Sequence, residues 1–122
     1  MGRMKGFTYL ASPYSHPDPQ VRYARYMNAC QAAAHLMRQG QVVFSPIAHS
    51  HPIELHAPDL TGFEFWIGQD LPLLARAERL VVLKLDGWAQ SRGVQFEIDY
   101  SFAYGIPLEF LEPDDVAFNL QS

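Results

Sequence analysis

The sequence predicts an α/β domain built on a parallel sheet, and two observations lead to this prediction. Short runs of strand-forming apolar residues alternate with longer stretches whose apolar residues recur every three or four positions. Such alternation is typical of a parallel sheet with helices on both faces. Of the 122 residues, 48% are hydrophobic and 18% charged, which fits a buried core rather than a disordered chain. We therefore expect residues 1–122 to form a single domain.

The first expected strand covers residues 7–11 and ends at a proline-rich loop. Asp18 and Pro19 close this loop, and this pair is typical of an N-cap and the first position of a helix. Gly40 marks the expected end of that helix. The apolar residues expected on its buried face are Tyr26, Ala29, Cys30, Ala33, Leu36 and Met37.

A second short strand is expected at residues 42–44, ended by a Ser-Pro pair. Residues 47–60 contain three histidines and two prolines, so we expect a loop with at most one helical turn. Residues 61–77 are predicted to be mostly helical, with a kink or a restart at Pro72. The core residues expected from this segment are Phe65, Trp66, Leu73 and Leu74.

Residues 79–85 include Leu-Val-Val-Leu, which indicates a central strand buried on both faces. A loop at 86–92, a helix at 93–104 ended by Gly105, and a last strand at 107–111 complete the order. A polar tail follows. Right-handed crossovers then favour a flavodoxin-like, Rossmann-like three-layer sandwich with four to five parallel strands in the order 2-1-3-4.

In such a sheet a ligand binds beyond the carboxyl ends of the strands, where the strand order reverses. The order 2-1-3-4 places this crevice between the first and third strands, at residues 11–16 and 86–93. The helix that follows brings Glu97 to the edge of the crevice. Taken alone, Glu97 is explained more simply by the dipole at a helix N-terminus. Asp70, likewise, has a simple explanation as the N-cap of a restarted helix.

Several segments nevertheless form a characteristic series when they are taken in order. They are Tyr9-Leu10-Ala11-Ser12-Pro13, Gly40 to Pro46 with its strand, Asp70, the Leu-Val-Val-Leu-Lys-Leu-Asp strand, Ser91-x-Gly93-Val94-x-x-Glu97, and Gly105-Ile106-Pro107. This series resembles the nucleoside 2-deoxyribosyltransferase-like superfamily over nearly the whole chain. It is also similar to small uncharacterised bacterial members of that superfamily, whose substrates need not be nucleotides.

The resemblance implies that the chain cleaves an N-glycosidic bond. Glu97 would stabilise and capture the oxocarbenium-like sugar, and Asp70 would protonate the leaving base or orient the sugar. Tyr9 could hydrogen-bond the nucleophile and set its direction. No cofactor is needed for this chemistry.

The resemblance also implies an anion site. Ser12, Ser91 and the backbone N–H groups around Gly93 would bind a phosphate at a helix N-terminus. Transferases of the superfamily carry an acid where this chain has Ser91, and a serine there resembles the nucleotide N-hydrolase branch, in which it helps to bind a 5′-phosphate. We therefore expect hydrolysis of a nucleoside 5′-monophosphate, with a nucleoside substrate and transfer to a second base left open.

Two other classes of function remain open. The first is a non-catalytic nucleotide or nucleotide-sugar binding module, which would keep the phosphate site without needing the two acids. The second is a metal-dependent hydrolase built on His49, His51 and His56. For these histidines we favour a surface or crevice-lining role over metal binding.

Charge and composition restrict the partners. The net charge of −4 argues against nucleic-acid and anionic-membrane binding, because both need a basic surface. A single cysteine fits the reducing cytoplasm, and the start at Met1–Lys5 leads into an apolar run that is too short for a signal peptide. Aromatic residues reach 13%, and we expect them to form the interface of a homo-oligomer, a dimer or tetramer, whose neighbouring chain closes the site.

Overall fold

Four parallel strands form the sheet, in the order β2-β1-β3-β4. The computed structural model describes residues 6–116, and its strands are β1 (Thr8–Ala11), β2 (Val43–Phe44), β3 (Arg79–Leu83) and β4 (Leu108–Leu111). Each neighbouring pair of strands is parallel. The predicted α/β class, the four-stranded parallel sheet and the order 2-1-3-4 are therefore confirmed.

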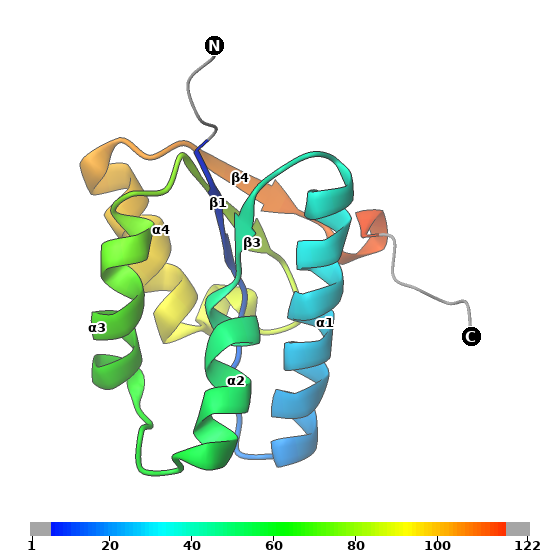
Figure 1. The fold of residues 1–122 in the computed structure, drawn as a ribbon, viewed down its shortest axis with the longest axis vertical. Coiled ribbons are helices and arrows are strands. Elements are labelled where there is room, and N and C mark those ends of the chain that lie inside the picture. The colour runs from blue at the N-terminus through cyan, green and yellow to red at the C-terminus, as the bar shows by residue number, and fades with distance from the viewer. Residues whose placement is uncertain (1–5, 117–122) are drawn as a thin grey trace.

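Within residues 6–116, four helices surround the sheet and give three layers (Figure 1). They are α1 (Pro19–Arg38), α2 (Pro46–His56), α3 (Phe63–Leu74) and α4 (Arg92–Tyr104). Helix α1 covers one face, and α3 and α4 cover the other. Helix α2 follows β2, packs against α1 and β1, and extends beyond the carboxyl ends of the strands. Two short 3-10 helices lie at Trp88–Gln90 and Pro113–Asp115.

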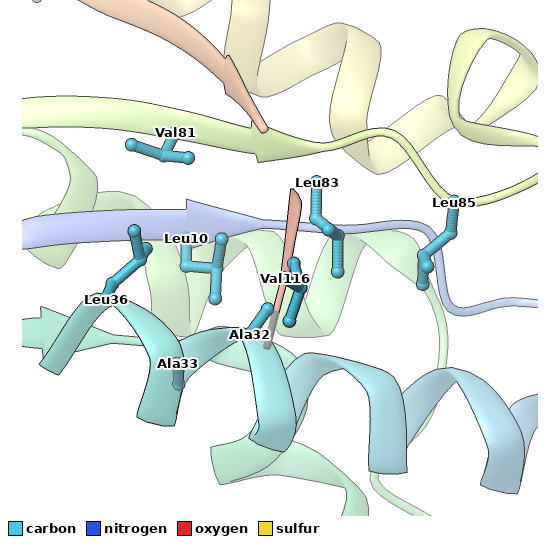
Figure 2. Close-up of a cluster of buried hydrophobic side chains, with 8 residues drawn as sticks. All are labelled: Leu10, Ala32, Ala33, Leu36, Val81, Leu83, Leu85 and Val116. Carbon is cyan, nitrogen blue, oxygen red and sulfur yellow. The ribbon is translucent and has the colours of Figure 1, made fainter. Parts of the chain in front are cut away.

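The core is divided between the two faces of the sheet, as the alternation of side chains along a strand requires. The side chains of Leu10 of β1 and of Val81 and Leu83 of β3 point toward α1 (Figure 2). Toward α3 and α4 point Tyr9 and Ala11 of β1, with Leu80 and Val82 of β3. Tyr9 is thus buried beneath the carboxyl end of the sheet, on the face covered by α3 and α4.

The helix ends confirm the predicted capping signals. The Asp18 carboxylate accepts a 2.8 Å hydrogen bond from the Gln20 N–H and caps α1. Gly40 and Gly105 follow α1 and α4 with φ values of 90° and 71°, the left-handed region that glycine adopts without strain. Ser91 caps α4 through a 3.2 Å bond from the Val94 N–H.

The predicted loop at residues 47–60 is wrong, because α2 occupies most of it. Ser45 accepts a 3.1 Å bond from the Ala48 N–H and Pro46 takes the first helical position, so this Ser-Pro pair starts a helix as well as ending a strand. The buried residues of α2 are Pro46, Ser50 and His51. Because two of these three side chains are polar, the sequence does not show the apolar residues at every third or fourth position that predict a helix.

Of the kink or restart predicted at Pro72, the restart is wrong, because α3 continues through it to Leu74. Asp70 is therefore an interior residue of α3 and not the N-cap of a new helix. Of the core residues predicted here, Leu74 is fully buried and Trp66 half-buried, whereas Phe65 and Leu73 are each 37% exposed. The buried face of α3 carries Asp70, so an acid occupies a place where the pattern suggested an apolar residue.

Helix α1 buries Ala29, Ala32, Ala33 and Leu36, while Met37, predicted for this face, is 52% exposed. No helix in residues 6–116 is long and apolar enough to cross a membrane. Residues 1–5 and the end of the polar tail lie outside the described residues.

Candidate active site

A cavity of about 1150 Å³ lies beyond the carboxyl ends of β1 and β3. Its walls come from the loop after β1, the start of α1, helices α2 and α3, and the first turns of α4. This is the switch point of the strand order, where open α/β sheets bind ligands. Five of the six residues expected at the site line it: Ser12, Asp70, Ser91, Gly93 and Glu97.

Glu97 lies at the floor of this cavity and is 6% exposed. It shares the buried face of α4 with Val94, Ile98 and Ser101, which is the face that the three-and-four spacing predicted. The sixth expected residue, Tyr9, donates a 2.5 Å hydrogen bond from its hydroxyl group to Glu97 Oε2. Residues 88 positions apart in the sequence thus meet beneath the cavity.

Tyr9 is held in place for this bond by the sheet itself. Its side chain is fully buried on the face covered by α3 and α4, and its ring contacts Phe44 with 5.7 Å between ring centroids. Burial raises the pKa of Tyr9 well above its usual value, and the charges of Glu97 and Asp70 act in the same direction. The hydroxyl group therefore stays protonated and acts as a donor.

Asp70 brings a second carboxyl group into the same cavity from α3. It is 7% exposed, and its Oδ1 atom has no hydrogen-bond partner among the described residues. Burial raises the pKa of Asp70 to about 7. Burial also raises the pKa of Glu97 to about 8; the hydrogen bond from Tyr9 opposes this shift and the charge of Asp70 adds to it. The two acids therefore hold at least one proton near neutral pH.

The remaining three expected residues border the same space. Ser91 uses its oxygen as an acceptor for the Val94 N–H, which leaves its O–H free to donate. The Ser12 Oγ atom is buried and has no partner among the described residues. A Cβ atom at Gly93 would meet nothing within 4 Å, so the backbone there is open to the cavity. The first N–H groups of a helix have no partner within the helix, and they favour an anion.

Two arginines on α1 order the loop after β1. Arg22 donates to the carbonyl groups of His16 and Pro17, and Arg25 donates to the carbonyl groups of Ser15 and Asp86 at 2.9 and 3.0 Å. Arg25 thereby ties the loop after β1 to the loop after β3. A Cβ atom at residue 87 would lie 2.8 Å from Arg25 Nη2, so the glycine found there permits this contact.

The histidine-rich segment lies on α2, and its three histidines have different surroundings. His51 is buried against the cavity, with Nδ1 2.7 Å from the Tyr14 hydroxyl oxygen and its ring stacked on Tyr26 at 4.3 Å. His49 contacts the Phe44 ring, and His56 is exposed at the end of the helix. Across residues 6–116, no group of three or more histidine, cysteine or acidic side chains could hold a metal ion. The metal-hydrolase hypothesis therefore has no site in the described chain.

Sequence reasoning missed the part of the outer cavity that α2 provides, where Glu54 lies. Trp66, expected in the core, lines the cavity as well. Tyr14 and Arg92 belong to the ranges 11–16 and 86–93 that were expected there, and Arg92 donates to Glu64 at 2.9 Å and lies 4.1 Å from the Phe63 ring. Glu54 and His51 lie three residues apart on α2, and Trp66 lies four residues before Asp70 on α3. The second spacing lies in the segment predicted to be helical, whereas the first could be recognised only if residues 46–56 were known to form a helix.

Fold and site together define the class of the protein: a small doubly wound α/β domain with two buried carboxyl groups in a cavity at its switch point. Residues 6–112 match the profile of the family described as "Domain of unknown function (DUF1937)", and the chain belongs to this family. No curated protein matches the chain.

Proposed function

We propose that this protein hydrolyses the N-glycosidic bond of a nucleoside 5′-monophosphate, with Glu97 as nucleophile. The observation that carries the proposal is the buried carboxyl pair: Glu97 is oriented by Tyr9, and Asp70 lines the same cavity with an oxygen that no described residue contacts. The reaction passes through an oxocarbenium-like state, which a carboxylate below the sugar stabilises.

The reaction has two steps. In the first, a Glu97 oxygen bonds to the anomeric carbon while the carbon–nitrogen bond breaks. The base leaves with the bonding electrons and takes a proton from Asp70. In the second, Asp70 accepts a proton from water, the water oxygen bonds to the anomeric carbon, and Glu97 is released. A second base in place of water would make the reaction a glycosyl transfer.

The reactive form needs Glu97 ionised and Asp70 protonated. Tyr9 donates to Glu97 and favours its carboxylate, whereas the Asp70 Oδ1 atom receives no donor among the described residues. Positive charge that develops on the sugar draws the negative charge further toward Glu97. With pKa values of about 7 for Asp70 and about 8 for Glu97, the reactive form is the less populated of the two singly protonated forms near neutral pH, and it lies only about 1.4 kcal/mol above the other.

A 5′-phosphate would lie between Ser12, Ser91 and the backbone at Gly93. Free hydroxyl donors and unpaired helix N–H groups suit an anion, and the α4 dipole favours negative charge there. The phosphate also gives the enzyme binding energy remote from the bond that breaks, which it can use to position the sugar.

The test is base release by the full-length chain from a panel of nucleoside 5′-monophosphates and nucleosides, with and without a second free base, followed by chromatography. We expect release from monophosphates, lost in Glu97→Gln and Asp70→Asn and kept in the matched control Asp99→Asn, whose side chain is exposed on the same helix. Release that survives in Glu97→Gln would contradict the mechanism. A wild-type chain that binds nucleotides but releases no base would instead be a binding module.

We further propose that the protein works in the cytoplasm as a homo-oligomer, either a dimer or a tetramer. Phe102 and Tyr104 support this, because α4 leaves both rings largely exposed to water. The single Cys30 fits a reducing compartment. Sedimentation velocity tests the assembly, and a strict monomer at micromolar concentration would contradict it.

A further inference from the structure

The outer part of the cavity differs in chemistry from its floor. On α3, Trp66 lies one helical turn from Asp70 and about 6 Å from it along the helix axis. Glu54 of α2 lies beside Trp66, close enough for the indole N–H to affect its pKa, and the loop after β1 contributes Tyr14 to the same cavity. An aromatic ring with a carboxyl group beside it thus lies one turn along α3 from Asp70, where a base attached to the sugar would extend.

Glu54 is half-buried and makes no ion pair with any described residue. Burial raises its pKa, while the Arg22 guanidinium and the Trp66 indole N–H act in the opposite direction. The Trp66 N–H already donates a 2.9 Å bond to the Leu60 carbonyl oxygen. The Glu54 carboxylate, which lines the cavity, can therefore still accept hydrogen bonds from a ligand.

Both side chains are fixed by their neighbours. The bond to Leu60 and the edge contact with Phe65, 5.0 Å between ring centroids, hold the Trp66 ring. On α2, His51 is joined to Tyr14 at 2.7 Å, which anchors the helix one turn before Glu54. A rigid aromatic wall with a fixed acceptor beside it is a recognition site for a flat ring that carries N–H donors.

We propose that Glu54 and Trp66 form the base-recognition site and select bases that carry an amino group. This inference rests on the proposed function, because it assumes that the ligand is a nucleotide. A carboxylate accepts hydrogen bonds and donates none, so an amino group pairs with it, whereas a carbonyl oxygen in the same place is repelled. Trp66 provides the surface against which the ring packs.

The test compares bases that differ by an amino group in place of an oxo group. The pairs are cytidine and uridine 5′-monophosphates, and adenosine and inosine 5′-monophosphates. Binding is followed by the fluorescence of Trp66. The chain has two tryptophans, and the second, Trp88, packs against Phe110 and does not line the cavity. All proteins in this test therefore carry Trp88→Phe, so that the signal comes from Trp66 alone. We expect the amino member of at least one pair to bind roughly tenfold or more tightly, the range of one charge-assisted hydrogen bond.

Glu54→Gln should reduce this ratio to about threefold or less, because the amide can donate to an oxo group. Glu109→Gln, at an exposed glutamate on β4, is the matched control and should keep the ratio. Should Glu54→Gln fold poorly, as judged by circular dichroism, Glu54→Asp replaces it and should lower the ratio by withdrawing the carboxylate one carbon.

The inference is overturned if neither pair shows a preference in the wild type, or if the preference persists in the Glu54 variants. Base release is measured separately on the same nucleotides. Amino-selective binding without base release would refute the proposed reaction and leave the recognition site standing. Base release without amino selectivity would refute the recognition site and leave the proposed reaction standing.

Discussion

Glu97→Gln should stabilise the protein against unfolding, and by more at high pH than at low pH. Burial raises the pKa of Glu97 from an ordinary value of 4.5 to about 8 in the folded state. The folded state therefore binds this proton more tightly than the unfolded state does. The contribution of Glu97 to the free energy of unfolding of the wild type is highest below pH 4.5, and it falls as the pH rises toward 8. Glutamine does not ionise, so the variant lacks this loss.

The size of the effect follows from the shift. One pKa unit corresponds to about 1.4 kcal/mol, so the gain of Glu97→Gln over the wild type is about 1 kcal/mol at pH 5, ~3 at pH 7 and ~4 at pH 8. The amide oxygen can still accept the hydrogen bond from Tyr9, so little else changes beneath the cavity. Groups that do not interact with Glu97 titrate alike in both proteins and cancel in the comparison, whereas the repulsion between Asp70 and Glu97 is part of the effect of the substitution.

The assay is urea unfolding followed by circular dichroism at pH 5, 6, 7 and 8, on the wild type, Glu97→Gln and the control Asp99→Asn. We expect the free energies of unfolding of Glu97→Gln and the wild type to diverge by about 3 kcal/mol between pH 5 and pH 8. The control should follow the wild type. A difference that is constant across this range would refute a buried Glu97 with a raised pKa.

Four further predictions concern the site and the core. Base release should have a bell-shaped pH dependence with both limbs near neutrality, because the two carboxyl pKa values are raised to about 7 and 8; limbs near pH 4 would contradict this. Tyr9→Phe should lower the free energy of unfolding by about 1–2 kcal/mol and move the limb near pH 8 to higher pH, since the lost bond favours ionised Glu97; an unchanged limb would contradict this prediction. Ser91→Asp keeps an acceptor at the N-cap of α4 but brings a negative charge next to the proposed phosphate. The KM for 5′-monophosphates should therefore rise roughly tenfold or more, while the KM for nucleosides stays nearly unchanged. Equal effects on both substrates would refute the phosphate site. Leu74→Ala should cost about 2–5 kcal/mol and Leu73→Ala under about 1 kcal/mol in thermal or urea unfolding, and similar costs would show that both leucines are equally buried.

Most of the fold could be predicted from local signals in the sequence. Periodicity and caps at Asp18, Gly40 and Gly105 located α1 and α4, and the apolar runs located all four strands. The run at β3 indicated its central place because both of its faces are covered. Right-handed crossover connections then allowed the strand order to be inferred.

Helix α2 could not be recognised, because a helix that buries Ser50 and His51 beside a cavity has no apolar stripe. Pro52 and Pro72 also suggested breaks, yet neither helix ends there, since a single lost backbone bond is offset by the packing around it. Tertiary contacts thus overrode the local signals at both places.

The same limit applies to the site. Glu97 follows from its place after β3, and Asp70 was recognised by resemblance although its helix continues through Pro72. The bond from Tyr9 to Glu97 depends on tertiary structure and cannot be read from spacing. The part of the outer cavity that α2 provides was missed together with that helix, because Glu54 acquires its place only when that segment is helical.

The proposed mechanism makes Glu97 the nucleophile at the floor of the cavity. It is tested by the single-turnover rate of base release from the best nucleoside 5′-monophosphate, measured for the wild type, Glu97→Gln and Asp99→Asn. We expect a loss of about a thousandfold or more in Glu97→Gln and none in Asp99→Asn. A Glu97→Gln rate within about tenfold of the wild type would contradict it.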